Sequence, residues 1–185
     1  MPSILPWRLM SPACVLAMGL ACPVAQAQAP AEPAGPSSTT ATYGDWTVRC
    51  VPPPQHPAGA KVCEVSQAIR VEDRPGIMAQ VAFGAWPKDA PLRVVVQLPN
   101  GVFLPPGVRL LPQEGATTGV DLAYSTCLQG CFADAEVGPD LLVTLTSSTG
   151  PARLEFVNNA RSRVVLQVSL DGLKAALDAG LKTGG

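Results

Sequence analysis

Apolar and polar residues alternate with a period of two along most of this chain, which is typical of β-strands with one buried face. The pattern is clearest over 46–50 and 63–70, where polar residues occupy every second position. The residues expected to point inward from these two strands are Trp46, Val48, Cys50, Cys63, Val65 and Ile69. A proline-rich connection joins the two segments, so we expect them to lie side by side.

Similar alternation recurs towards the C-terminus. It predicts further strands over 77–86, 92–98, 108–111, 120–124, 153–157 and 163–169. Eight or so short strands separated by turn residues indicate an antiparallel sheet. The predicted fold is therefore mainly β, an antiparallel β-sandwich or barrel-like domain with one or two short helices.

Two segments break the alternation. The tail has an apolar stripe at helical spacing, made of Leu170, Leu173, Leu177 and Leu181. It predicts a C-terminal helix, with Ser169 as its N-cap and Gly180 as a stop or fraying point. The segment 140–148 follows Pro139, which suits a helix start, although its β-branched residues also suit a strand. We expect a short helix there.

The N-terminus has the three parts of an export signal. Arg8 supplies the positive charge, 12–24 is apolar, and Ala25 and Ala27 provide small residues for cleavage. Residues 1–27 are thus predicted to be a signal peptide. The apolar stretch is shorter than the roughly 20 residues of a membrane-spanning helix, so no stable transmembrane anchor is predicted. Acylation at Cys22, as in a lipoprotein, is the alternative.

Residues 28–42 contain no large apolar side chain. Such a segment gains too little from burial to offset the entropy of ordering, so we expect a flexible linker followed by a single domain over 43–185. Without Arg8 the chain has 12 basic and 14 acidic residues, a net charge of about −2. This balance gives no indication of nucleic-acid binding.

Four cysteines follow the signal, in two close pairs. Cys50 and Cys63 point inward from adjacent predicted strands, whereas Cys127 and Cys131 flank a turn that contains Gly130. An exported chain with evenly paired cysteines is typical of a disulfide-bonded domain, so we predict two disulfides between neighbours. A redox-active pair or a zinc site at Cys127 and Cys131 are the alternatives, and zinc requires reduced thiolates.

Few residues suggest catalysis. His56 lies in a proline-rich loop, Ser125 and Thr126 lack a nearby base to activate them, and Asp134 and Glu136 form a common acidic pair. We therefore predict no catalytic residues, no metal site and no cofactor.

The segment 98–108 is the candidate partner surface. Its prolines cannot donate to a sheet ladder, so the segment should follow an edge or the surface. It nevertheless carries Val102, Phe103 and Leu104. An apolar tip on a proline-stiffened loop loses little entropy on docking, which favours recognition. The alternative is that Phe103 folds inward as a lid on the core.

Other side chains have simpler interpretations. Trp46 and Trp86 are expected to anchor the core. Arg161 and Arg163 fit the solvated face of a strand, although they could also bind an anionic partner.

Five sequence blocks occur in an order and spacing that resemble the invasion-associated locus B family. They are Gly44-Asp45-Trp46 before Cys50, Cys63-Glu64-Val65-Ser66, residues 98–108, Cys127-Leu128-Gln129-Gly130-Cys131-Phe132-Ala133, and Ser169-Leu170-Asp171-Gly172-Leu173. The resemblance covers 43–181. It implies a bacterial, mostly alphaproteobacterial, envelope protein of mainly β structure, linked in one pathogenic lineage to host-cell entry. It implies no enzymatic activity.

These patterns predict an exported, non-catalytic protein that binds or supports another periplasmic or surface component. The expected location is the periplasm, with outer-membrane association or secretion as alternatives. The expected partner is an unidentified envelope protein or a host-facing component. The second hypothesis is a thiol-disulfide oxidoreductase or chaperone that uses Cys127 and Cys131.

Overall fold

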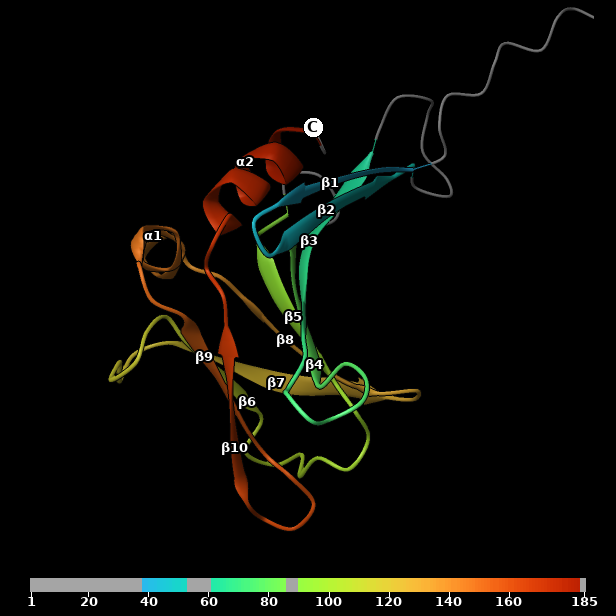
Figure 1. Cartoon of the computed structure of the whole chain (residues 1–185), viewed down its shortest axis with the longest axis vertical. Helices are drawn as coiled ribbons and strands as arrows, with labels where there is room; N and C mark the ends of the chain where they lie inside the picture. Colours follow the sequence, from blue (N-terminus) through green and yellow to red (C-terminus); the bar gives the residue numbers. More distant parts are fainter. Residues whose placement is uncertain (1–37, 53–60, 86–89, 184–185) are drawn as a thin grey trace, which may run out of the picture. The chain divides into compact units, whose positions relative to one another are not determined.

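The computed structural model describes residues 38–52, 61–85 and 90–183, and this part of the chain contains ten strands and two helices (Figure 1). The strands are β1 (Thr39–Tyr43), β2 (Trp46–Val51), β3 (Val62–Ile69), β4 (Ala79–Gly84), β5 (Arg93–Leu98), β6 (Val108–Leu111), β7 (Val120–Cys127), β8 (Cys131–Glu136), β9 (Ala152–Val157) and β10 (Arg163–Val168). The helices are α1 (Pro139–Ser147) and α2 (Leu173–Thr183). The predicted signal peptide, His56 and Trp86 lie outside the described residues.

The strands form one antiparallel sheet in the order β1-β2-β3-β4-β5-β8-β7-β6-β9-β10. The sheet curls into a half-barrel, so that its inward side chains pack against one another. The predicted mainly β, antiparallel class with a C-terminal helix is confirmed. Figure 1 shows α2 lying over the end of the sheet formed by β1, β2 and β3.

The inward face of β2 and β3 agrees with the predicted alternation. The six predicted inward residues are all buried: Trp46, Val48, Cys50, Cys63, Val65 and Ile69. The Trp46 and Phe83 ring centroids lie 5.6 Å apart. Trp46 is therefore a core anchor, as expected.

Two strands differ from the sequence prediction. β1 begins at Thr39, inside the predicted linker 28–42, because its backbone pairs with β2 and an edge strand needs few apolar side chains. β8 is absent from the predicted strands. Its inward positions after Cys131 are the small residues Ala133 and Ala135, which leave little periodic signal.

Both predicted helices are present, but α2 has different ends. The Ser169 hydroxyl accepts a hydrogen bond from the Asp171 N–H at 3.2 Å, so it stabilises the turn before α2 and does not cap the helix. Gly180 does not end α2 either. A Cβ at this position would lie 2.7 Å from Cγ2 of Val65, and the missing side chain lets α2 pack closely on β3.

A buried side-chain amide joins β3 to the chain just after β10. Nε2 of Gln67 donates to the Ser169 carbonyl at 3.2 Å, and Oε1 of Gln67 accepts from the Ser169 N–H at 3.0 Å. Nε1 of Trp46 donates to the same carbonyl at 2.9 Å. This Gln67–Ser169 pairing connects the last strand of the sheet to the third.

Each cysteine pair forms the predicted disulfide. Cys50–Cys63 joins directly opposite residues of β2 and β3, and both sulfurs lie in the core. Cys127–Cys131 closes the turn between β7 and β8. The first disulfide closes the longer loop, because its cysteines are 13 residues apart and those of the second are 4 apart.

We expect replacement of both Cys50 and Cys63 by Ala to lower thermal stability more than replacement of both Cys127 and Cys131. Loop-closure entropy accounts for about 3 kcal/mol for the longer loop and about 2 kcal/mol for the shorter one. Burial of the first pair widens the difference. Calorimetry of the two double variants measures it, and equal melting temperatures would contradict the expectation.

Gln67→Leu should reduce the free energy of unfolding by about 2 kcal/mol, because it leaves the buried N–H of Ser169 without its acceptor. Urea denaturation measures the change. Gln80→Leu is the matched control, because Gln80 of β4 is half-buried and lies on the sheet face opposite to that of Gln67. Its free energy of unfolding should stay close to that of the wild type. A Gln67→Leu midpoint equal to that of the control would show that the pairing does not stabilise the fold.

Candidate functional site

An apolar cavity of about 380 Å³ opens where three segments distant in sequence meet. Its walls come from the β3–β4 connection, the β5–β6 connection and the β9–β10 hairpin. The apolar lining residues include Val71, Met78, Val102, Phe156, Val164 and Leu166. This size and lining are typical of a site for one apolar group.

The predicted partner residues 102–104 lie beside this cavity. Val102 lines the cavity and forms an isolated β-bridge with Asn158. The Phe103 N–H donates to the Val157 carbonyl at 2.8 Å, which fixes the loop against β9. Leu104 is 45% exposed. We call residues 102–104 the 102–104 surface.

Phe103 is neither a lid sealed in the core nor a fully exposed tip. Its side chain is half-buried, and the guanidinium carbon of Arg161 lies 3.7 Å from its ring centroid. Arg161 reaches this position from the β9–β10 turn, where its φ of 60° is left-handed. The contact is a cation–π interaction, and it leaves the Arg161 charge at the surface.

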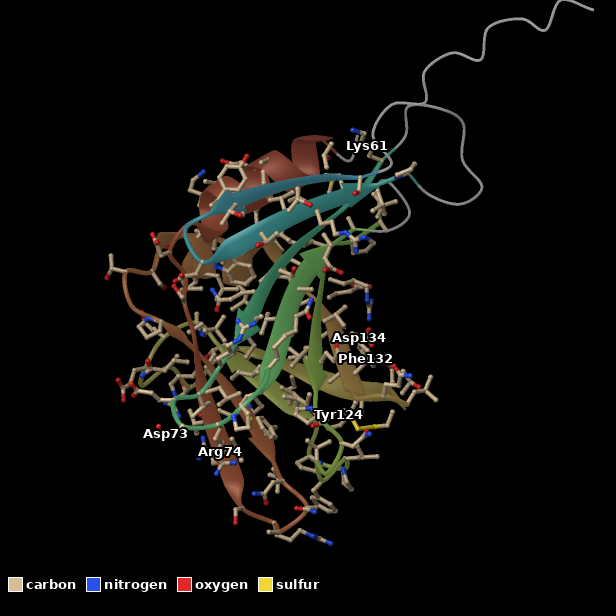
Figure 2. All side chains as sticks on the ribbon, turned by 45° about the vertical axis from the view of Figure 1, so that its right-hand side comes forward. Lys61, Asp73, Arg74, Tyr124, Phe132 and Asp134 are labelled. Atoms are coloured by element: carbon tan, nitrogen blue, oxygen red, sulfur yellow. A yellow bond between two sulfur atoms is a disulfide. The ribbon has the colours of Figure 1, made fainter. Side chains whose placement is uncertain are left out.

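One charged side chain lines the apolar cavity. Arg74 lines the cavity from the β3–β4 connection, where Figure 2 labels it, and forms no ion pair with any residue in the described part of the chain. Arg163 of β10, by contrast, pairs with buried Glu155 of β9. An anionic group of a ligand would therefore find Arg74 available.

A second cavity, of about 940 Å³, lies farther along the same boundary between β3 and β10. Its walls are mainly polar and include Thr47, Ser66, Arg70, Gln167, Ser169 and Asp171. Residues of β3 and of the β10 end thus line opposite sides of one polar cleft.

The residues considered for catalysis have structural partners. Oγ of Ser125 donates to the Phe132 carbonyl at 3.3 Å. The hydrogen bond from Arg93 lowers the pKa of Asp134, with a smaller contribution from Ser125. The paired carboxylate (Figure 2) is therefore held ionised, which does not suit a general acid. Glu136 also contacts Arg93, at 3.5 Å, and Thr126 is an exposed residue of β7.

The Cys127–Cys131 turn has the environment of a structural crosslink. The Leu128 N–H donates to the Gly130 carbonyl at 2.9 Å, and Cys131 is buried. Sγ of Cys131 lies 3.8 Å from Oδ1 of Asn100, a neutral amide. Reactive cysteines are typically activated by a cationic neighbour, and this neutral amide does not supply one, although Cys127 itself is exposed.

The sequence pattern did not identify Arg74 or the β3–β4 wall of the apolar cavity. The available signal was apolar Val71 and Met78 around the Pro75-Gly76 turn. Within the described residues, no helix has the length and apolar character needed to cross a membrane.

Comparison with known proteins gives consistent matches. Residues 46–180 match the family described as invasion associated locus B (IalB) protein. Two Brucella abortus proteins, each named an invasion protein B homolog, are 31% identical over 147 residues, which cover 79% of this chain and 81% of each relative. The crystal structure of invasion associated protein B from Bartonella henselae has a TM-score of 0.62 at 20% identity, covering 78% of this chain and 96% of that one.

The Tyr124 hydroxyl, on the strand that leads to the Cys127–Cys131 turn, provides a test of how its burial affects stability. The Tyr124 hydroxyl is buried and has no hydrogen-bond partner among the described residues. Burial raises its pKa to about 12. An unfolded tyrosine ionises near pH ~10, so the folded state retains this proton while the unfolded state loses it.

We expect stability to fall as the pH rises from about 10 to about 12, and Tyr124→Phe to remove part of that fall. At neutral pH the variant should equal or exceed wild-type stability, because it removes an unpartnered buried hydroxyl. Urea denaturation at both pH values measures this, with Tyr43→Phe as control. Destabilisation of Tyr124→Phe at neutral pH would indicate that the hydroxyl has a partner.

Proposed function

The chain belongs to the invasion-associated locus B family, and from this premise we propose that it is an exported envelope protein that binds another periplasmic or surface component. The observation that carries the proposal is the apolar cavity beside the 102–104 surface. A cavity of about 380 Å³ that opens next to a 45% exposed leucine offers a partner both a recess and a projecting apolar group.

The loop that carries this surface is already fixed in place. The Phe103 N–H bond to Val157 and the Val102–Asn158 bridge tie it to β9. The Asn100 side-chain amide donates to the Leu128 carbonyl at 3.3 Å, which ties it to the β7–β8 turn as well. Docking onto such a loop orders few new side chains, so more of the contact energy remains as affinity.

A non-catalytic role fits the chemistry of the described residues. Asp134 is held as an ion pair by Arg93, and the Ser125 hydroxyl is engaged by a backbone carbonyl. The neutral surroundings of the Cys127–Cys131 disulfide do not favour the oxidoreductase alternative. The proposed activity is therefore binding.

The two disulfides support a location outside the reducing cytoplasm, and we propose the periplasm. Outer-membrane association or secretion is compatible with the same chemistry. The Brucella relatives are named as invasion protein B homologs, and a protein that acts in invasion would have to leave the cytoplasm. The partner is either an envelope protein or a host-facing component.

Leu104→Asp should abolish partner recovery without unfolding the protein. The substitution places a charge on an exposed apolar contact, and binding should weaken by about tenfold or more, equivalent to about 1.4 kcal/mol. The measurement is chemical cross-linking of the tagged protein in its own cell envelope, followed by quantification of the cross-linked product.

Leu128→Asp is the matched control, because Leu128 is 80% exposed in the β7–β8 turn. Both variants should keep the wild-type melting temperature, and only Leu104→Asp should lose the product. If both variants yield the wild-type amount of product, the 102–104 surface is not the binding site. A large drop in the melting temperature of Leu104→Asp would show that Leu104 serves the fold.

A further inference from the structure

The last strand of the sheet has an unpaired edge. β10 pairs with β9 on one side and is the end of the strand order on the other. Asn158 donates its N–H to the Ser162 carbonyl, which places the hydrogen-bonded pairs of this ladder at the even-numbered residues of β10. The main-chain N–H and C=O groups of Arg163, Val165 and Gln167 therefore point away from β9.

The next residue in this series is already paired. Ser169 is the following odd-numbered residue, and both its N–H and its C=O bond to the carboxamide of Gln67. One amide side chain thus supplies the donor and acceptor that a neighbouring strand would supply. The pairing stops there and leaves three residues of the edge open.

Two cavities follow the same edge. The apolar cavity is lined by Val164, Val165 and Leu166, and the polar cavity by Gln167 and Ser169. Both cavities also have a wall formed by β3 or the β3–β4 connection, from Ser66 to Arg70 in one and at Val71, Arg74 and Met78 in the other. Space for an extended chain therefore lies between β10 and this wall.

We propose that the partner contributes an extended peptide segment that binds along β10 as an added strand, with one apolar side chain in the 380 Å³ cavity and an acidic residue facing Arg74. This inference rests on the proposed binding function and specifies the chemistry of the partner. Arg163 to Gln167 offers a stretch of about 16 Å, which a segment of about five residues covers.

The cleft favours a peptide over a second copy of this chain. Since the β3–β4 connection lines the same cavities as β10, a folded domain would have to displace that wall to reach the edge, whereas a single strand fits inside it. Arg163 on the edge also opposes self-pairing, since charged side chains protect edge strands from one another. The unpaired charge of Arg74 selects an acidic segment.

Val165→Pro tests the added strand directly. It removes one N–H that faces the cleft, and proline is tolerated in an edge strand where its nitrogen faces outward. Val165→Thr is the matched control, because it keeps the N–H and a β-branched side chain. Circular dichroism and melting temperature establish that each variant is folded.

The probe is a phage-displayed library of random linear peptides, selected on the full mature protein. A selected peptide is then synthesised, its Kd is measured by fluorescence anisotropy, and amide hydrogen exchange is followed by NMR. We expect apolar and acidic residues in the selected sequences. We also expect affinity to fall by about tenfold or more in Val165→Pro while Val165→Thr stays close to wild type. The Val165 and Gln167 amides should exchange more slowly in the complex.

Three results would overturn the inference. These are failure to select any peptide, a peptide that protects no amide of β10, and wild-type affinity in folded Val165→Pro. A concentration-dependent dimer in sedimentation that Val165→Pro abolishes would instead assign the edge to a second copy. These outcomes do not test the proposed function. If Leu104→Asp loses the cross-linked envelope partner, binding at the 102–104 surface is supported even when no peptide pairs with β10.

Discussion

The carboxamide of Gln67 joins β3 to the chain after β10, where the curled sheet meets itself. An antiparallel sheet that curls without closing leaves its last strand with no neighbour, and here β10 meets the third strand instead of the first. The Gln67 carboxamide bonds to both the N–H and the C=O of Ser169, and the Trp46 indole donates a second hydrogen bond to the Ser169 carbonyl. The turn that follows leads directly into α2, which packs on β2 and β3. The segment around Ser169 thus links the end of β10, the approach to α2 and the lining of the polar cavity.

Several charged groups on the outer face are paired across strands. Arg93 bridges β5 to β8, Arg109 of β6 contacts Asp121 of β7, and Glu155 receives Arg153 and Arg163. Exposed pairs of this kind contribute little individually, whereas the buried carboxylate of Glu155 requires its partners. Within the described residues Arg74 has no ion pair, and neither do Arg49 and Arg70. Arg74 differs from these two in lining the apolar cavity, where its charge would favour an acidic group of a ligand.

Much of the fold was predictable because the hydrophobic periodicity of a strand or helix can be recognised within its own short segment. The alternation around Trp46 and Val65 and the leucine stripe of the tail each reflect one buried face. β8 was not predicted because Ala133 and Ala135 contribute almost no periodic signal. β1 was not predicted because its stability comes from pairing with β2. Of the candidate site, the sequence indicated only Val102 to Leu104, and their role in binding stays a prediction. Its other walls lie far away in sequence, and the Arg161–Phe103 contact depends on a left-handed residue that no hydrophobic pattern reveals.

The Gln67–Ser169 pairing also sets an order of events during folding. The two residues are separated by 102 positions, so their encounter requires closure of a loop that contains most of the domain. β2, β3 and β4 can pair through short connections, but the curl cannot close until the chain beyond β10 is present. Until then the amide of Gln67 lacks its Ser169 partner, although β10 can already pair with β9 through their short hairpin. A polypeptide that emerges N-terminus first would therefore complete most of its sheet early and form the candidate cleft beside β10 last.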